Sequence, residues 1–401
     1  MRRTVITGIG IWSCIGQNIA EVERSLRTGH SGIGIDHKRT VYGYQSPLTG
    51  IVPHPDMKAE GLRRAQRICL SEPAEYGYMA IKQALRQCGI TDLRRCGLIV
   101  SNDSTAGALA VTEEIMHTHH DSRQLSAGMV FQSLNSTVSM NLASIFGIGG
   151  LTLSLSAACA GGGHAVGLAQ SLIRAGRLDC CIVVGTQEVG LHAYTSFDAL
   201  GVFSRRTDAP AAASRPFDIQ RDGLVPSGGA ACLVLESEDF AAMGHRRPLA
   251  SVIGYGFSTS PNIVSPSVES IQCAMTNALD DARLSSNDIA LVMAHATGTR
   301  DGDNAEAEAI SVVWGDANPY IVSTKALTGH ECWMSGVSQV VYAIIQMQNR
   351  FVAPHINLTQ PDKAAASLNI PTTLVNDASL PAVLCNAFGF GGTNASLVLT
   401  I

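Results

Sequence analysis

Three short apolar segments of this 401-residue chain return in the same order after about Pro248. The matched pairs are Arg3–Ser13 with Ala250–Ser260, Cys96–Gly107 with Ile289–Thr299, and Gly228–Glu236 with Gly391–Thr400. Self-similarity of this kind indicates an internal duplication. We therefore expect two similar halves, residues 1–247 and 248–401. Because no linker separates them, they should share one core.

Apolar runs bounded by glycines alternate with segments of helical periodicity, which indicates an α/β fold with a helix-covered sheet. The expected strands are Thr4–Ile9, Cys96–Val100, Leu151–Leu155, Asp179–Val184 and Gly229–Leu235. The expected helices are Ile19–Thr28, Pro73–Cys88 and a segment that begins just after Cys159.

The composition excludes several classes of protein. With 46% hydrophobic and 15% charged residues, the chain can bury a large core. A net charge of −5 argues against nucleic acid as the main partner. Gly8 and Gly10 interrupt the only apolar run that resembles a signal peptide, and no run is long enough to span a membrane. Eleven cysteines without a CxxC pair suggest reduced thiols in a cytoplasm.

The stretch Leu151–Gly167 (LTLSLSAACAGGGHAVG) places Cys159 between a buried strand and an apolar helix. A helix N-terminus presents unpaired N–H groups and about half a positive charge, which favours a thiolate. Small neighbours leave room for a substrate carbonyl. Cys159 is thus a candidate nucleophile, although a buried structural cysteine remains an alternative.

Three further polar segments follow apolar strands, where open α/β sheets gather their ligands. They are Ala294–Thr299 with His295, Ser323–His330 with Lys325, and Asn386–Asn394 with its GFGG turn. Each alone fits a structural histidine or an ordinary turn. A zinc site formed by both histidines and a cysteine lacks the usual local ligand pairs. The set as a whole points to nucleophilic catalysis.

These motifs resemble the β-ketoacyl-acyl-carrier-protein synthases of the thiolase superfamily, and above all the bacterial type I elongating group. The resemblance runs from VITGIG near the N-terminus through Ser214–Gly223 (SRPFDIQRDG) to NAFGFGGTNASLVL. It implies a thiolase-like fold of two duplicated halves in α-β-α-β-α layers. It also implies a dimer, either a homodimer or a heterodimer with a related ketosynthase, whose acyl pocket lies near the interface.

The resemblance implies a decarboxylative Claisen condensation. Cys159 would hold the acyl group as a thioester, with the backbone N–H groups of Cys159 and Phe390 as oxyanion hole. His295 and His330 would polarise the malonyl carbonyl and stabilise the enolate. Phe390 would also gate the acyl pocket.

Other residues would support this chemistry. Lys325 would hold the histidine loop, paired with Glu306, because an unpaired buried ammonium is costly. Asp303 would be structural. Thr297 and Thr299 would hydrogen-bond the pantetheine amides.

The resemblance also implies an acyl carrier protein as the partner and the source of the phosphopantetheine, with no bound cofactor and no metal. The cluster Arg63, Arg64 and Arg67 falls where relatives meet that acidic carrier, although it also fits a solvated helix face.

Two segments depart from the family pattern. Glu331–Gly336 (ECWMSG) replaces small residues, and Trp333 adds volume where the family packs tightly. Phe131–Met140, expected at the pocket or an interface, carries several polar side chains. We hypothesise a pocket or partner surface tuned to an unusual acyl chain, such as an aryl or polyene chain; ordinary repacking is the alternative.

The alternatives to fatty-acid elongation differ in what they require. A specialised polyketide or aryl-polyene ketosynthase would keep every residue named above. A non-catalytic chain-length partner would lack the cysteine. A coenzyme A thiolase or a priming synthase would lack the paired histidines, and a cysteine hydrolase would not need Lys325.

Overall fold

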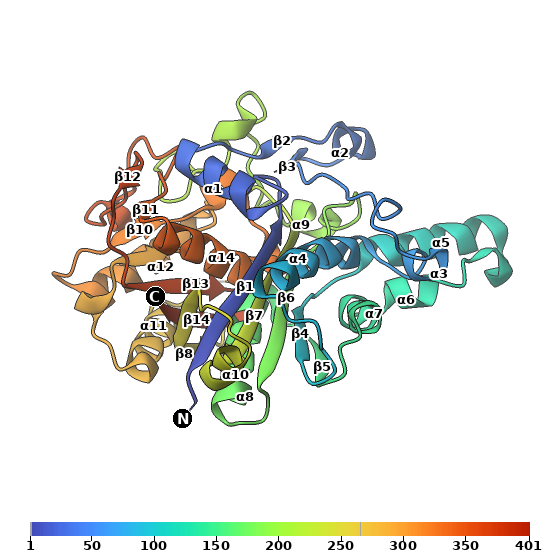
Figure 1. The fold of residues 1–401 in the computed structure, drawn as a ribbon. Coiled ribbons are helices and arrows are strands. Elements are labelled where there is room, and N and C mark those ends of the chain that lie inside the picture. The colour runs from blue at the N-terminus through green and yellow to red at the C-terminus, as the bar shows by residue number, and fades with distance from the viewer. Residues whose placement is uncertain (1, 265) are drawn as a thin grey trace.

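The chain forms one mixed sheet covered by helices in the computed structural model, which describes residues 2–264 and 266–401 (Figure 1). The strands of this sheet are β1 Thr4–Trp12, β4 Gly97–Ser101, β5 Thr152–Leu155, β6 Cys180–Gln187, β7 Gly229–Ser237, β8 Ala250–Thr259, β9 Leu291–Met293, β10 Tyr320–Val322, β13 Ala382–Phe388 and β14 Thr393–Thr400. Two small sheets pair β2 Ile33–Ile35 with β3 Leu48–Gly50 and β11 Phe351–Val352 with β12 Val375–Asn376.

The helices alternate with these strands. They are α1 Ile19–Thr28, α2 His37–Tyr42, α3 Arg64–Arg67, α4 Glu72–Cys88, α5 Ala106–His119, α6 Met129–Ser133, α7 Thr137–Phe146, α8 Gly161–Arg174, α9 Thr195–Leu200, α10 Glu238–Met243, α11 Val268–Ala282, α12 Arg300–Trp314, α13 Lys325–Thr328 and α14 Ser335–Gln348. Short 3-10 turns include η1 Ser122–Gln124, η2 Ala158–Ala160, η5 Cys332–Met334 and η7 Phe390–Gly392.

The two halves of the sheet have the same topology, which confirms the duplicated fold. The full strand order is β10-β9-β13-β14-β8-β1-β7-β6-β4-β5. Each half contributes five strands, which can be numbered along the chain within that half. From the outer edge of the sheet to its centre, the order in both halves is third, second, fourth, fifth and first. The first two neighbour pairs are parallel and the next two antiparallel in each half. Only three residue pairs, Thr4–Ile6 with Ala250–Val252, join β1 to β8.

Helices α8 and α14 form the middle layer. They pack against each other and against strands of both halves, while α4 and α7 cover the outer face of the first half and α11 and α12 lie outside the second (Figure 1). The largest buried cluster lies in this middle layer and combines residues of both halves, such as Ile9, Val183, Leu291 and Val337. The outer helices of the first half, its strands, the middle helices α8 and α14, the strands of the second half and its outer helices thus form successive layers. This is the α-β-α-β-α order that the resemblance implies.

Local sequence explains the elements that the patterns predicted. All eight residues of β6 (CCIVVGTQ) are buried, as expected of a strand covered on both faces. Helix α1 has the predicted bounds because Asn18 caps its N-terminus and Gly29, at φ 69°, ends it. Across the described residues, no helix combines the length and hydrophobicity that crossing a bilayer requires.

Candidate active site

Cys159 lies where the sequence predicted, between a strand and a helix. It follows β5 in the turn η2 and precedes α8, and its side chain is only 6% exposed. The preceding residue, Ala158, has φ 45°, a left-handed conformation that residues with a β-carbon rarely adopt. The Asp103 carboxylate accepts a hydrogen bond from the Ala158 N–H at 3.1 Å. This turn fixes the thiol at the start of α8.

Both predicted histidines lie beside this cysteine. His330 Nε2 is 3.1 Å from Cys159 Sγ, and the His330 Nδ1 atom lies 3.3 Å from the Ser335 hydroxyl. The rings of His295 and His330 have centroids 5.2 Å apart and are nearly perpendicular, at 86°. His295 reaches the site from the segment after β9, and His330 from the segment after α13. The geometry therefore joins residues that come from the two halves of the chain.

The surroundings of Cys159 favour the thiolate. The neighbouring Cys332 thiol is the largest influence that lowers the pKa of Cys159 well below its usual value. Burial opposes this shift, whereas the charge and hydrogen bond of His330 and the charge of Lys325 support it. The net direction favours the nucleophilic thiolate over the thiol. Cys332 was not among the predicted site residues.

His295 is held as a neutral imidazole. Burial lowers its pKa well below the usual value, and the positive charges of Lys325 and His330 lower it further. Within the described residues, its Nδ1 atom has no hydrogen-bond partner. A neutral imidazole donates one hydrogen bond, so His295 can polarise a carbonyl oxygen without supplying a full charge.

The expected pairing of Lys325 with Glu306 is wrong. Both Glu306 oxygens are used by other donors, namely the His295 N–H at 2.8 Å, the Ala296 N–H at 2.6 Å and the Asn386 amide at 2.9 Å. Among the described residues, Lys325 Nζ has neither a hydrogen bond nor an ion pair. Burial lowers the pKa of Lys325 to about 8, against the opposing charge of Glu306. Glu306 instead fixes the backbone that carries His295.

A second buried carboxylate, Glu331, lies beside the catalytic loop. It accepts hydrogen bonds from the Ser338 hydroxyl at 2.5 Å and the Tyr342 hydroxyl at 2.8 Å. Burial raises the pKa of Glu331 to about 7, although both hydrogen bonds and the charge of Lys325 oppose the shift. The sequence flagged this position as a departure but gave it no role.

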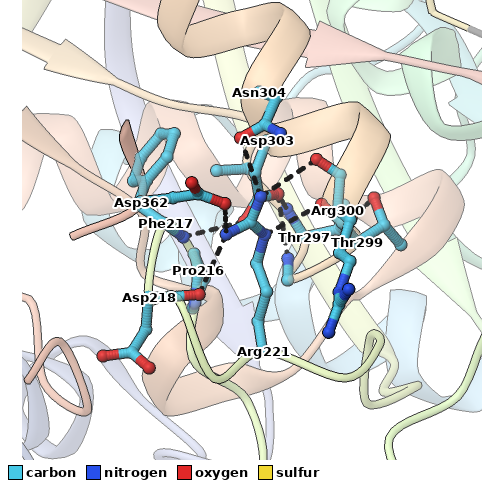
Figure 2. A network of polar contacts seen from close by, with 12 residues as sticks. Pro216, Phe217, Asp218, Arg221, Thr297, Thr299, Arg300, Asp303, Asn304 and Asp362 are labelled. Carbon is cyan, nitrogen blue, oxygen red and sulfur yellow. Dashed lines mark hydrogen bonds and ion pairs between the residues drawn. The ribbon is translucent and has the colours of Figure 1, made fainter. Parts of the chain in front are cut away.

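The turn between β9 and α12 is held by a buried arginine (Figure 2). Arg221 donates to the carbonyl of Thr299 at 3.3 Å and to the Asp362 carboxylate at 2.8 Å, and lies 3.5 Å from Asp303. Asp303 in turn accepts the N–H of Thr297 at 2.9 Å and of Gly298 at 3.0 Å. These contacts fit the structural role expected of Asp303. Sequence reasoning missed Arg221, although it lies within the SRPFDIQRDG motif that carried the resemblance.

A cavity of about 610 Å³ opens over the site. Its wall includes Cys159, His295 and His330, and the predicted pantetheine contacts Thr297 and Thr299. The two threonine hydroxyls lie 3.1 Å apart and can bond each other when no ligand is bound. Further wall residues are Tyr194, Phe197, Val202, Phe203, Leu224, Arg300, Cys332 and Phe390.

The glycine-rich turn after β13 touches the Cys159 backbone. A β-carbon at Gly389 would lie 3.0 Å from the Cys159 nitrogen, a tighter contact than β-carbons usually make, so glycine favours this close approach. Phe390 follows in η7, is 36% exposed, and stacks on Phe197 with ring centroids 6.1 Å apart. This arrangement brings the Phe390 segment to the place where the predicted oxyanion hole requires it.

Trp333 is buried near the cavity. Its ring centroid lies 6.2 Å from that of Phe197, and its carbonyl accepts a hydrogen bond from the Ser101 hydroxyl at 2.9 Å. The stretch Phe131–Met140 does not contribute to the wall of this cavity. Phe131 and Leu134 are instead exposed, at 43% and 44%.

The arginine cluster lies away from the catalytic residues. Arg64 and Arg67 belong to α3, and Arg63 precedes it. Arg63 and Arg64 are exposed, while Arg67 is half-buried and donates to the Leu62 carbonyl at 2.5 Å. Two of the three guanidinium groups are thus free to meet an acidic partner.

Two family sequence models match the chain. The model described as "Beta-ketoacyl synthase, N-terminal domain" matches residues 1–241, and "Beta-ketoacyl synthase, C-terminal domain" matches residues 249–359. The 3-oxoacyl-(acyl-carrier-protein) synthase 1 of Haemophilus influenzae is 34% identical over 99% of this chain and 98% of its own length. The enzyme of the same name from Escherichia coli strain K12 is 35% identical over 100% of this chain and 99% of its own length.

Solved structures with similar folds include two ketosynthases. A β-ketoacyl synthase from Burkholderia phymatum superposes with a TM-score of 0.94 at 29% identity and covers 100% of this chain and 99% of its own. The ishigamide ketosynthase/chain length factor superposes with a TM-score of 0.91 at 27% identity, with the same coverage. The agreement extends over the whole chain and so includes every segment that forms the cavity.

Proposed function

The chain belongs to the β-ketoacyl synthase family of acyltransferases, and we propose that Cys159 carries the acyl group in the condensation that elongates fatty acids. The observation that carries this proposal is the buried Cys159 sulfur, 3.1 Å from His330 Nε2 and beside the neutral His295. A polarised thiolate and two imidazoles in one cavity fit a covalent acyl-transfer step followed by enolate formation.

The first half-reaction loads the enzyme. The Cys159 thiolate attacks the carbonyl carbon of an acyl thioester, and the thiol of the carrier leaves as the acyl-Cys159 thioester forms. The backbone N–H groups of Cys159 and Phe390 stabilise the oxyanion of the tetrahedral intermediate. The contact of Gly389 with the Cys159 backbone supports this pairing.

The second half-reaction forms the carbon–carbon bond. A malonyl thioester loses CO₂, and His295 and His330 donate hydrogen bonds to the oxygen of the resulting enolate. The enolate carbon attacks the acyl-Cys159 carbonyl, and the cysteine sulfur leaves as 3-oxoacyl thioester forms. Lys325 supports this step electrostatically, since its charge helps to keep His295 neutral.

The substrates arrive on an acyl carrier protein, whose phosphopantetheine enters along Thr297 and Thr299. Arg63, Arg64 and Arg67 form the docking patch for that acidic carrier; the exposure of Arg63 and Arg64 supports this role. No cofactor beyond the carrier's own arm is required by this chemistry.

The finer organisation is also part of the proposal. Residues 1–247 form the half with the nucleophile, and residues 248–401 form the half with the histidine and lysine loops. The enzyme works in the cytoplasm as a homodimer or as a heterodimer with a related ketosynthase. The exposed apolar side chains of Leu109, Phe131 and Leu134 on and beside α5 and α6 are consistent with a partner subunit.

A specialised polyketide or aryl-polyene ketosynthase is the second candidate. The aromatic side chains near Cys159 favour it, because Phe197 contacts both Trp333 and Phe390 and its ring lies 6.3 Å from that of Tyr194. Flat aromatic walls suit a planar, conjugated acyl chain.

One experiment tests both candidates. Purified protein is mixed with malonyl carrier protein and a panel of saturated, polyene and aryl acyl carriers, and 3-oxoacyl products are measured by mass spectrometry. Products from saturated chains support elongation, and a strong preference for conjugated chains supports the second candidate. Condensation by a Cys159→Ala variant at the native rate would refute both.

A further inference from the structure

Cys332 adds a second thiol to the wall of the catalytic cavity. Its side chain is 3% exposed, and it belongs to the same buried cluster as Cys159. Both residues line the cavity, and both contact His330: the Cys332 thiol donates to its carbonyl at 3.6 Å, and its Nε2 atom lies 3.1 Å from the Cys159 sulfur. The condensation assigned to Cys159, His295 and His330 has no step that needs this second thiol.

Two strained turns in contact carry the two thiols. Cys332 opens the turn η5 with φ 43°, and Ala158, just before Cys159, has φ 45°. Both values lie in the left-handed region, which costs about 1 kcal/mol or more for a residue with a β-carbon. The turns η2 and η5 pack against each other. Because the surrounding structure maintains two strained turns in contact, the position of the two cysteines in neighbouring turns is a fixed feature of the site.

The two thiols have opposite acid–base character. The environment of Cys159 favours its thiolate, whereas the interaction with the Cys159 sulfur, burial and the negative charge of Cys159 together raise the pKa of Cys332 well above its usual value. A low-pKa cysteine beside a protonated one is the arrangement of a reactive thiol and a resolving thiol. The cavity gives a small oxidant access to both sulfurs.

We propose that Cys159 and Cys332 form a peroxide-reactive dithiol site that closes reversibly to an intramolecular disulfide. The site takes hydrogen peroxide or a small organic hydroperoxide. The disulfide protects Cys159 from irreversible oxidation. Its further consequence, a reversible block of condensation, rests on the proposed function.

The chemistry balances with one peroxide molecule. The Cys159 thiolate attacks one peroxide oxygen, the O–O bond breaks, and the departing hydroxide takes a proton to become water, leaving a sulfenic acid at Cys159. The Cys332 sulfur then attacks the Cys159 sulfur, the S–O bond breaks, and the Cys332 proton leaves with the hydroxyl as a second water. Two thiols lose two electrons and peroxide gains them. The two sulfurs then form a bond of about 2.05 Å.

A second thiol pair elsewhere provides an internal comparison. Cys96 and Cys180 also shift each other's pKa in opposite directions and are almost completely buried, but neither lines the cavity. If cavity access and the activated thiolate direct the reaction, this second pair stays reduced when Cys159 and Cys332 have reacted.

The test follows the native protein directly. Purified protein is treated with a small excess of hydrogen peroxide, free thiols are alkylated, and a non-reducing digest is analysed by mass spectrometry. We expect a Cys159–Cys332 linked peptide that is two hydrogen atoms lighter than its parts, loss of acyl loading, and recovery of most loading with dithiothreitol. Cys159 sulfinic acid without any linked peptide in the native protein would overturn the proposal.

Variants test whether Cys332 acts as the resolving thiol or only lies near Cys159. In Cys332→Ser and Cys332→Ala proteins, each compared with its own untreated sample, peroxide should drive Cys159 to sulfinic acid that dithiothreitol does not reverse. A Cys273→Ser variant on α11, where the cysteine is exposed and does not line the cavity, should behave as the native protein does. Equal recovery in the Cys332 variants and the native protein would contradict the proposal.

The dithiol proposal and the proposed function can each fail while the other stands. A linked peptide in a protein that never accepts acyl groups would leave the dithiol standing and remove the proposed function. Acyl loading with no linked peptide would support the proposed function and overturn the dithiol proposal.

Discussion

At the scale of single residues, burial sets the charge state of the site. Burial lowers the pKa of His295 well below its usual value and that of Lys325 to about 8, and raises the pKa of Glu306 and Glu331 to about 7. Of the groups in this site, only Cys159 has a pKa shifted toward its charged form, first by the neighbouring Cys332 thiol and then by His330. The cavity therefore concentrates reactivity at one sulfur.

A His295→Ala variant should separate the two half-reactions. His295 does not contact the Cys159 sulfur through any hydrogen bond of the described residues, whereas His330 does at 3.1 Å. We expect acyl loading of Cys159 to stay within a few-fold of native, while decarboxylation of malonyl carrier protein falls about 10²-fold or more, as for a lost transition-state donor. Radiolabelled CO₂ release and intact-protein mass measure the two steps. An equal loss in both would contradict the assignment.

Glu331→Gln should change how stability depends on pH. The folded-state pKa of Glu331, about 7, lies above its usual value of 4.5, so its contribution to stability is present below pH 4.5 and is lost as pH rises through 7. Removing the charge should raise the melting temperature more at pH 8 than at pH 5. The matched control is Glu308→Gln, at an exposed position on α12. The same pH profile in the native and Glu331→Gln proteins would be evidence against this cause.

At the scale of elements, the turn between β9 and α12 orders the substrate-facing side of the cavity. Arg221 crosses from the segment after α9 to bind this turn, and Asp303 fixes its N–H groups (Figure 2). The hydroxyls of Thr297 and Thr299 then face the cavity from a rigid backbone.

Arg221→Ala should lower both stability and substrate affinity. The change leaves the Asp303 carboxylate buried without its cation, which costs about 3 kcal/mol or more. We expect a clear drop in the urea midpoint and a higher KM for malonyl carrier protein. The alkylation rate of Cys159 by iodoacetamide should stay close to native, because Arg221 does not contact that side of the cavity. Arg205→Ala, an exposed arginine of the same chain segment, serves as control.

Local patterns predicted the elements better than they predicted the contacts between side chains. The junction at Cys159 and helix α1 follow from apolar runs, glycines and the Asn18 cap, all of which are local in sequence. The Lys325–Glu306 pairing failed because three donors from separate segments compete for one carboxylate. In the sequence, Cys332 stood out only as part of a segment that departs from the family pattern. Its proximity to Cys159 arises from the packing of η5 on η2, which the sequence does not show.

At the scale of the molecule, the two halves are joined more by their shared middle layer than by their sheet. Only three residue pairs connect β1 with β8, whereas α8 and α14 each pack on strands of both halves. The largest buried cluster combines both halves, and the site itself needs Cys159 from one and His295 from the other.

The halves should therefore unfold together. Scanning calorimetry of the full chain is expected to give one transition, because opening either half exposes the apolar surface of α8 and α14. A separately produced fragment 248–401 should lack a cooperative transition. Two well-separated transitions in the full chain would show that the middle layer does not couple the halves.

The most direct test of the central claim is the position of the acyl group. Native protein is incubated with acyl carrier protein in the absence of malonyl substrate, digested without exposure to nucleophilic reductants, and analysed by peptide mass spectrometry. We predict one acyl group per chain, on Cys159, and none on a Cys159→Ala variant. An acyl group on another residue, or unchanged loading of the variant, would contradict the account.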